Sequence, residues 1–360
     1  IEAMQLPFPK KDLQQKIVWF LNDLKSNKLS DKIYFNESVE DEILKHQHIG
    51  ISLLTISTEL QHQSDLIKKL RQSILQDAVR GRFDFAQRPA NEESASELLK
   101  KIKAEKQKLI SEGKLKKASP AEAKRRQEKE LPPITKDEIP FELPKGWAWC
   151  RLGSLITIMD SGWSPACKEH EADVDKWGVL KTTAVQALKY LEFENKQLPD
   201  SLAPKPQYET KIGDILITRA GPANRVGVCC LVEETRSKLI ISDKIIRFHL
   251  FERYVFSKFI SLCLNTGYSK YYIDSKKSGM ALSQVNISQN NLKLTPIPLP
   301  PLSEQERIVT KVEALMQTCD DLAKEVEHSK TQLQHLMQSV LMEAFEGKQT
   351  VKEIKIKEKV

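Results

Sequence analysis

One short segment of the sequence combines residue types that can read DNA bases. Residues 218–225 run Thr-Arg-Ala-Gly-Pro-Ala-Asn-Arg, a polar stretch bent by Gly-Pro. Arginine pairs with guanine through two hydrogen bonds, and asparagine pairs with adenine, at base edges in the major groove. Arg219, Asn224 and Arg225 are therefore the first candidates for DNA contacts. A hairpin whose arginines simply stay solvated is the competing explanation.

Two more polar stretches carry residue types suited to a nucleic-acid surface. Lysines bind backbone phosphates, which set register and affinity without reading sequence, whereas asparagine and glutamine can read adenine. A structural role or a solvated loop would explain both stretches as well. The further candidates for DNA contacts are Lys181, Thr182, Thr183, Lys276, Lys277, Gln284 and Asn286.

A third pattern has the spacing of a nuclease site. Asp200 after a proline, followed by Glu209 and Lys211, fits the loose spacing at which carboxylates hold Mg²⁺ beside a lysine. Residues 198–206 are rich in proline and have the composition of a loop, which indicates that the match to the nuclease spacing arose by chance. The sequence contains neither the phosphate-binding pattern G-x-x-x-x-G-K-[ST] nor the Asn-Pro-Pro-Tyr/Phe motif of methyltransferases. We therefore expect a non-catalytic protein that needs no cofactor or metal ion.

The composition is that of a folded protein with a mild positive charge. The chain has 360 residues, 40% hydrophobic and 29% charged, with a net charge of +7, and its length suggests two or three domains. No stretch reaches the ~18 apolar residues of a membrane span, so we expect a cytoplasmic protein without membrane contact. The six cysteines show no metal-ligand spacing, which favours reduced thiols. The charge is compatible with a polyanionic partner without proving one.

An internal repeat frames the elements that would position these residues. Residues 6–18 match residues 297–309, and residues 72–81 match residues 338–347. Each copy is predicted to be a helix started by proline and followed by a long amphipathic helix, which ends at Gly81 or Gly347. The first copy is longer, and we place its extra residues around residues 22–45.

Both long helices carry apolar residues every seven positions, the pattern of a coiled coil. The two copies are predicted to pack as an antiparallel pair, and residues 49–80 would span about 48 Å at ~1.5 Å per residue. The pair would thus act as a spacer. One seam comprises Leu53, Leu60, Ile67 and Ile74 with Cys319, Val326, Leu333 and Val340, and the companion seam comprises Ile49, Ile56 and Leu70 with Leu315, Leu322 and Leu336.

A charged linker and a globular domain separate the two copies. The predicted fold class is α+β, a mixed α/β domain plus long antiparallel coiled-coil helices, with strands near residues 147–152, 177–183, 214–219, 225–232 and 239–248 and a helix near residues 254–266. The linker is predicted to be a solvated helix or flexible arm, or else a basic strap along a DNA backbone. The predicted divisions are residues 1–88, a first helical region; 89–142, the linker; 143–296, the globular domain; 297–349, a second helical region; and 350–360, a charged tail.

Five motifs give the chain a family resemblance. Together they resemble the specificity (S) subunit of type I restriction-modification systems, and their combination is specific although each alone is weak. The motifs are Ile297-Pro298-Leu299-Pro300-Pro301-Leu302 with Gln305 and Arg307-Ile308-Val309; Gln72-Ser73-Ile74-Leu75 with Ala78 and Gly81-Arg82; Lys103-Ala104-Glu105-Lys106; Phe141-Glu142-Leu143-Pro144-Lys145-Gly146-Trp147; and Gly213-Asp214-Ile215-Leu216.

The resemblance implies a layout and a set of partners. In that family, two target-recognition domains each read half of a bipartite site in double-stranded DNA, and two helical regions hold them apart and dock methyltransferase subunits, to which restriction subunits add. This chain shows both helical regions but one recognition domain. We therefore expect either a fragment carrying the second half or a half-subunit that forms a homodimer.

The expected function is thus a non-catalytic DNA-recognition subunit whose helices set the gap between half-sites. Ten base pairs span ~34 Å, the same scale as the predicted helix pair. Two alternatives stay open. One is a coiled-coil scaffold whose middle domain binds protein, and the other is the nuclease built on Asp200, Glu209 and Lys211.

Overall fold

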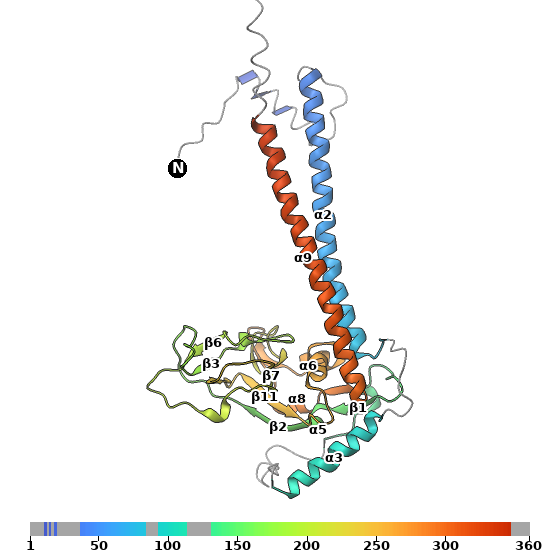
Figure 1. Cartoon of the computed structure of the whole chain (residues 1–360), viewed down its shortest axis with the longest axis vertical. Coiled ribbons are helices and arrows are strands. Elements are labelled where there is room, and N and C mark those ends of the chain that lie inside the picture. The colour runs from blue at the N-terminus through green and yellow to red at the C-terminus, as the bar shows by residue number, and fades with distance from the viewer. Residues whose placement is uncertain are drawn as a thin grey trace, which may run out of the picture. The chain divides into compact units, whose positions relative to one another are not determined.

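The computed structural model of the chain (Figure 1) describes residues 11–12, 14–15, 18–19, 37–83, 93–113 and 131–346. Residues 6–10, most of the extra segment at 22–45, Gly347 and the charged tail lie outside the described residues. The chain divides into two compact units, one formed by Ile1–Lys68 with Asp320–Val360 and one formed by Lys69–Cys319. Each unit is described separately below.

The first unit contains most of two long helices, α2 (Glu37–Val79) and α9 (Leu302–Glu346). Within it they run side by side in opposite directions (Figure 1). Leu53 and Leu60 of α2 pack with Val326 and Leu333 of α9, flanked by half-buried neighbours that include Ile67 and Val340. The predicted antiparallel coiled coil and its first seam are therefore present.

The companion seam is not closed. The exposed fractions of Ile56, Leu70, Leu322 and Leu336 are 47%, 45%, 40% and 50%. A pair of helices covers one apolar stripe, and a second stripe stays open unless further helices cover it. The heptad pattern by itself does not distinguish these two cases.

The second unit holds the other ends of both helices. On α2, Ala78 and Val79 are buried, and on α9 Ile308 is buried. Helix α2 ends at Val79, and Gly81 closes it with a φ of +66°, at a position where a Cβ atom would lie 2.5 Å from Cγ of Pro144. Only glycine fits this left-handed position against the proline, as the sequence predicts for this helix end.

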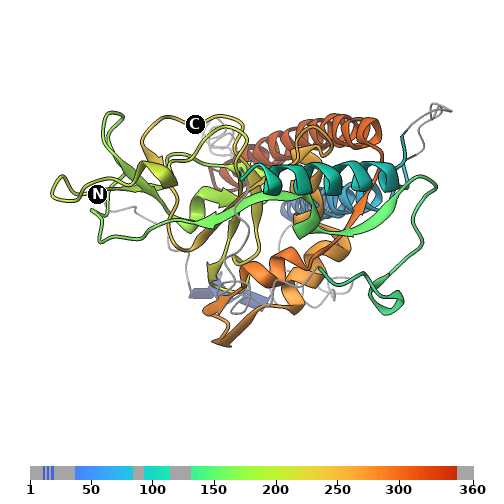
Figure 2. The ribbon, with the colours of Figure 1, turned by 90° about the horizontal axis from the view of Figure 1, so that it is seen from below.

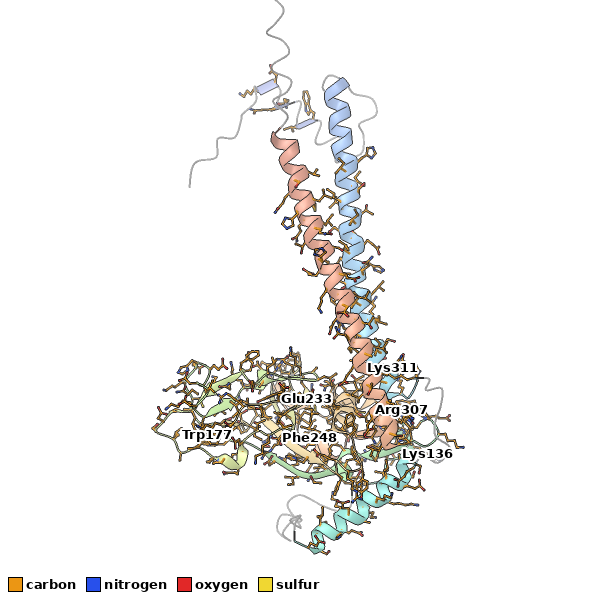
Figure 3. The ribbon with its side chains drawn as sticks, in the orientation of Figure 1. Lys136, Trp177, Glu233, Phe248, Arg307 and Lys311 are labelled. Atoms are coloured by element: carbon orange, nitrogen blue, oxygen red, sulfur yellow. The ribbon has the colours of Figure 1, made fainter. Side chains whose placement is uncertain are left out.

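A four-stranded antiparallel sheet forms the core of the globular domain. Its order is β2 (Ile156–Ser161), β11 (Ile245–Leu250), β7 (Ile215–Thr218) and β9 (Cys229–Leu231). Phe248 in β11 is fully buried (Figure 3), as are the three apolar residues of β7. Helix α6 (Ser257–Asn265) contacts β9 and is followed by α7 (Gly267–Ser275).

Smaller sheets complete the domain. Strand β1 (Ala148–Arg151) pairs antiparallel with β14 (Pro296–Leu299), which brings the start and the end of the domain together, as an insertion between two helical repeats requires. Three further sheets are β10–β3–β6 (Leu239–Ile240, Gly178–Leu180, Asn195–Gln197), β12–β13–β8 (Ser278–Ala281, Gln284–Asn286, Ala220–Gly221) and β4–β5 (Val185–Gln186, Lys189–Tyr190). The α+β fold class is confirmed.

The sequence pattern located helix α6 and the strands β1, β3, β7, β9, β10 and β11, but fewer than half of the strands described in the domain. Strand β2 was not predicted, since the polar residues Asp160 and Ser161 at its end break the apolar pattern. The expected strand at residues 239–248 is split into β10 and β11, and only residues 229–231 of the expected strand at 225–232 are extended. The remaining short elements join these segments: α5 (Leu152–Leu155), η2 (Lys136–Glu138), η3 (Thr182–Ala184), η4 (Pro206–Tyr208) and α8 (Gln289–Lys293).

A buried ion-pair cluster braces the core sheet. Arg247 of β11 lies 2.6 Å from Asp160 of β2 and also donates to the carbonyls of Gln207 and Glu209. Asp214, which precedes β7, is fully buried and accepts from the backbone N–H of Lys211 at 2.8 Å. These contacts give the Gly213-Asp214 motif a structural role, because they fix the turn that leads into β7.

The described part of the linker is docked onto the domain. Helix α3 (Ala95–Ser111), seen nearest the viewer in Figure 2, begins with a capping box between Ser94 and Glu97 and buries Leu98 and Ile102. Lys106 donates to the carbonyl of Gly153 at 3.1 Å. Residues 95–111 are thus a helix, one of the expected forms of the linker, but its apolar face is packed within the second unit rather than solvated on all sides.

Arg151 joins the end of the linker to the domain. Its guanidinium donates to both carboxylate oxygens of Glu138, at 3.0 and 2.6 Å, and to the carbonyls of Pro132, Pro133 and Leu294. Arg151 is buried, and its hydrogen bonds lower the pKa of Glu138 to about 2. No helix among the described residues is apolar and long enough to cross a membrane.

Candidate nucleic-acid interface

The three-stranded sheet β12–β13–β8 unites two polar stretches that lie far apart in the sequence. Val285 pairs with Gly221 and Asn286 with Ala220. Beyond the strands, the N–H of Ala223 donates to the carbonyl of Leu282 at 2.8 Å. The predicted stretches at 218–225 and 276–286 therefore form one surface. Figure 2 shows the orange hairpin of β12 and β13 projecting at the edge of the domain.

Lys277 fastens this surface to α7. Its ammonium donates to the carbonyl of Ala223 at 2.7 Å and lies 2.6 Å from the carboxylate of Asp274. Burial opposes ionisation of Asp274, but hydrogen bonds from Lys270 and Lys277 outweigh it and lower the pKa of Asp274. Only 11% of the Lys277 side chain is exposed. Lys277 is thus placed to hold the loop.

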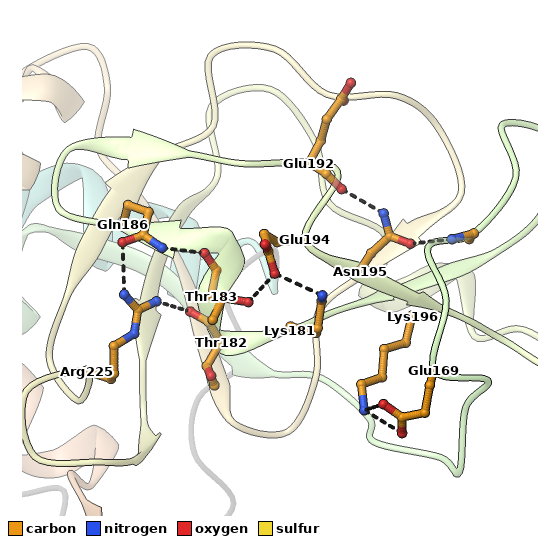
Figure 4. A network of polar contacts seen from close by, with 11 residues as sticks. Glu169, Lys181, Thr182, Thr183, Gln186, Glu192, Glu194, Asn195, Lys196 and Arg225 are labelled. Carbon is orange, nitrogen blue, oxygen red and sulfur yellow. Dashed lines mark hydrogen bonds and ion pairs between the residues drawn. The ribbon is translucent and has the colours of Figure 1, made fainter. Parts of the chain in front are cut away.

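Arg225 is likewise engaged inside the protein (Figure 4). Its guanidinium donates to Oε1 of Gln186 at 2.9 Å and to the carbonyls of Thr182 and Val185 at 2.8 and 3.0 Å. These bonds tie the 222–225 turn to η3 and β4. They leave Arg225 placed to position the loop rather than to reach across solvent to a base.

The stretch from Lys181 to Thr183 surrounds this anchor. Lys181 pairs with Glu194 at 2.9 Å, and the hydroxyl of Thr183 donates to the same carboxylate. These hydrogen bonds, with that from Thr183 the larger contributor, lower the pKa of Glu194. The exposed Thr183 and the half-buried Lys181 and Thr182 lie beside Arg225, so the structure brings this third stretch to the same region as the other two.

Five of the ten predicted residues combine an exposed side chain with a place on the sheet or its borders. On β13, Val285 is buried whereas Gln284 and Asn286 are exposed, because alternate residues of a strand face opposite sides. Oδ1 of Asn286 accepts from Ser278 at 3.1 Å, which fixes the plane of the amide and leaves its NH₂ group to donate outward. Arg219, Asn224 and Lys276 are the other exposed members.

A polar pocket of about 310 Å³ adjoins the sheet. It is lined by Arg219 together with Gln289, Asn290 and Lys293 of α8 and Ser288, which caps that helix. Gln289 is held by a 3.1 Å hydrogen bond to Ser161. The sequence analysis missed these four residues, although the polar run Ser-Gln-Asn-Asn directly after Ile287 was a signal of the same kind as the chosen ones.

The residues of the nuclease pattern have separate partners. Asp200 is paired with Lys176 at 2.9 Å, and Glu209 accepts from the backbone N–H of Lys238 at 2.7 Å. Among the described residues, no group of three or more His, Cys, Asp or Glu side chains is arranged to hold a metal ion. The geometry thus gives no support to the spacing pattern as a magnesium site.

The cysteines form no disulfide in the structure. Cys167 is half-buried and the other five are buried, as expected of reduced thiols. Burial raises the pKa of both Cys150 and Cys229 to about 12. These thiols therefore lie far from the reactive thiolate form.

Comparison with known proteins identifies relatives of one kind. The family model described as type I restriction modification DNA specificity domain matches residues 144–329. The chain is 45% identical to the type I restriction enzyme EcoEI specificity subunit of Escherichia coli and 28% identical to the EcoAI specificity subunit of the same organism, in each case over 93% of this chain and 57% of the relative. The chain thus spans a little over half the length of these relatives.

A solved structure also matches. The HsdS subunit from Thermoanaerobacter tengcongensis aligns with a TM-score of 0.39 at 18% sequence identity, over 81% of this chain and 57% of that one. The family model, which covers more than half of the sequence, matches the globular domain and the first part of α9. On that match, the chain belongs to the family of type I restriction-modification DNA specificity domains.

Proposed function

We propose that the chain is a non-catalytic DNA-recognition subunit whose domain at residues 143–296 reads one half of a target site in double-stranded DNA. The observation that carries this proposal is the sheet β12–β13–β8. It gathers exposed Arg, Asn, Gln and Lys side chains from two distant segments on one hydrogen-bonded frame. Base readers on a rigid frame are what sequence recognition requires.

The exposed side chains have distinct roles in this proposal. Gln284 and Asn286, which share a face of β13, would read adenine edges in the major groove, and Arg219 would read guanine. Asn224 would add a further base contact, and Lys276 would bind a backbone phosphate. A two-stranded ribbon such as β12–β13 is of the right width to enter the major groove.

The engaged residues would act indirectly. Lys277 and Arg225 fix the 222–225 turn, since Lys277 donates to its Ala223 carbonyl and Arg225, within the turn, donates to the carbonyl of Thr182. Lys181, Thr182 and Thr183 would support Arg225. Their replacement would therefore disturb DNA binding by releasing the turn. This division separates the ten candidates into five that contact DNA and five that position the contacting loop.

We further propose that the helices dock methyltransferase subunits, to which restriction subunits add, in the cytoplasm. The named relatives are subunits of type I restriction enzymes. The open apolar stripe, with Ile56 at 47% and Leu336 at 50% exposed, supports a partner along the helices. The same stripe could join two copies of the chain, and a homodimer would supply two recognition domains with the helix pair setting the distance between half-sites.

The proposal is tested by co-expressing the chain with its cognate methyltransferase subunit and mapping methylated adenines across the host DNA. A two-part palindromic motif is expected if two copies assemble, and adding one heptad to both helices should then lengthen the unspecified gap. A motif with a single specified half would support one domain acting alone. A stable complex that adds no sequence-specific methylation would contradict recognition by this chain.

A further inference from the structure

The tip of the β12–β13 hairpin presents an apolar side chain to solvent. Leu282 is 82% exposed, the highest value among the large hydrophobic side chains of the described residues. It lies in the turn between the paired residues Ala281 and Gln284, and the other residues of the tip are exposed as well. Among the described side chains, none covers it.

Folding does not account for a leucine at this position. The turn is Leu-Ser, and among the described residues neither Leu282 nor Ser283 has a positive φ, so most residue types would suit it. Leu282 is 82% exposed, so burial does not select leucine either. Because neither the turn nor packing selects leucine at this position, its role is to be sought in binding.

The tip is also held firmly. The carbonyl of Leu282 accepts from the N–H of Ala223, whose own carbonyl accepts from the buried ammonium of Lys277. Within the hairpin, Gly279 approaches its partner strand so closely that a Cβ atom would lie 2.4 Å from the carbonyl oxygen of Gln284. A side chain on such a frame loses little conformational freedom when it meets a partner.

The surroundings of Leu282 indicate the partner. Gln284, Asn286 and Asn224 are exposed around it, with Lys276 at the base of the hairpin. The apolar surface of one leucine, surrounded by amides and a lysine, is far smaller than the ~1,000 Å² of buried surface that a specific protein interface needs. It does match the one apolar group that base pairs present in the major groove, the 5-methyl group of thymine.

We propose that Leu282 contacts a thymine 5-methyl group in the major groove, next to the bases read by Gln284 and Asn286. This inference rests on the proposed function and adds a specificity-determining residue to it. The contact would distinguish thymine from cytosine or uracil at one position of the half-site. Its apolar character would leave the salt dependence of binding unchanged, because no phosphate is neutralised.

Deoxyuridine tests the contact directly, since it differs from thymidine only in lacking the methyl group. The full chain, assembled with its methyltransferase subunits, is titrated with its mapped target and with targets in which each thymine in turn is replaced by deoxyuridine. For the unsubstituted chain, one replacement should weaken binding about fourfold, the effect of losing one buried methyl-sized group. Leu282→Ala should bind the thymine target about as weakly and show no further loss with deoxyuridine there.

Two further variants serve as controls. Leu282→Met, which keeps an apolar tip, should retain the discrimination between thymidine and deoxyuridine. Val174→Ala alters a side chain that is 81% exposed between Asp173 and Asp175 and should retain it as well. The inference is overturned if Leu282→Ala discriminates thymidine from deoxyuridine as strongly as the unsubstituted chain does. It is also overturned if no deoxyuridine replacement weakens binding by the unsubstituted chain. Failure of the unsubstituted chain to prefer any sequence would instead overturn the proposed function.

Discussion

Arg219 and Arg225 belong to one loop, but their guanidinium groups have different surroundings. Arg219 is exposed beside a polar pocket, whereas Arg225 donates three hydrogen bonds to Gln186, Thr182 and Val185. Hydrogen bonds made by a charged group stabilise a fold more than neutral ones do. We therefore assign contact with DNA to Arg219 and positioning of the loop to Arg225.

Replacing each arginine by alanine should separate these roles experimentally. Arg225→Ala is expected to lower the free energy of unfolding by about 2 kcal/mol, because three acceptors lose a charged donor. Arg219→Ala should change it by less than about 0.5 kcal/mol, as is usual for exposed positions, while weakening DNA binding. Urea denaturation followed by tryptophan fluorescence gives both values, and equal destabilisation by the two variants would contradict the assignment.

The pair of Glu138 and Arg151 makes a prediction about pH. The folded-state pKa of Glu138 is about 2, well below its ordinary value of 4.5, so the ionised carboxylate stabilises the fold above pH 4.5. That stabilisation is lost as the pH falls from about 4.5 to 2. Glu138→Gln should be less stable than the unsubstituted chain at pH 7 and should show a shallower loss of stability over this range. Parallel pH profiles of the two proteins would contradict the role of this pair.

At the scale of residues, the sequence predicted the types of residue in the candidate interface but not which of their side chains are hydrogen-bonded within the protein. Arg225 and Lys277 look as available as Arg219 and Lys276 in the sequence. Their acceptors include backbone carbonyls of remote residues, Thr182 for Arg225 and Ala223 for Lys277. Such pairing follows from tertiary structure and leaves no local pattern.

At the scale of elements, the β12–β13 hairpin depends on Gly279. A Cβ atom there would lie 2.4 Å from the carbonyl oxygen of Gln284 and 2.8 Å from Cα of Val285. Because both atoms belong to the partner strand's backbone, the strands would have to separate. Gly279→Ala should therefore increase hydrogen exchange of amides in residues 278–286 and weaken DNA binding. Gly50→Ala, in a helix with open space around the new methyl group, is the matched control and should do neither.

The coiled coil makes its own prediction, since one seam is closed and the other is open. Leu60 of the closed seam is 9% exposed and Ile56 of the open seam is 47% exposed. Leu60→Ala should lower the free energy of opening by about 2 kcal/mol, as for other leucines removed from apolar cores, and accelerate amide exchange in α2 about thirtyfold. Ile56→Ala should have little effect in the isolated chain. Equal exchange in the two variants would contradict the packing of the seam.

The helices were more predictable from the sequence than the sheets. Heptads and the glycine at position 81 are local signals, and they correctly located the paired seam and the end of α2. The pairing of β8 with β13 joins residues 220–221 to residues 285–286. No local pattern encodes that pairing, so the union of the two polar stretches emerged only in the structure.

On the scale of the whole molecule, the globular domain lies in the sequence between the long helices α2 and α9. Strands β1 and β14 pair the two ends of this domain. Specificity and assembly would then reside in different parts of the chain.

The most direct test is selection of preferred sites from random duplex DNA by the full chain assembled with methyltransferase subunits. The unsubstituted chain should select a defined half-site. The double variant Gln284→Ala, Asn286→Ala should lose preference at one or two positions, each by roughly 5- to 150-fold, and keep the others, whereas Glu171→Ala on another exposed loop should leave the motif intact. An unchanged motif from the double variant would contradict the claim that this sheet reads the DNA.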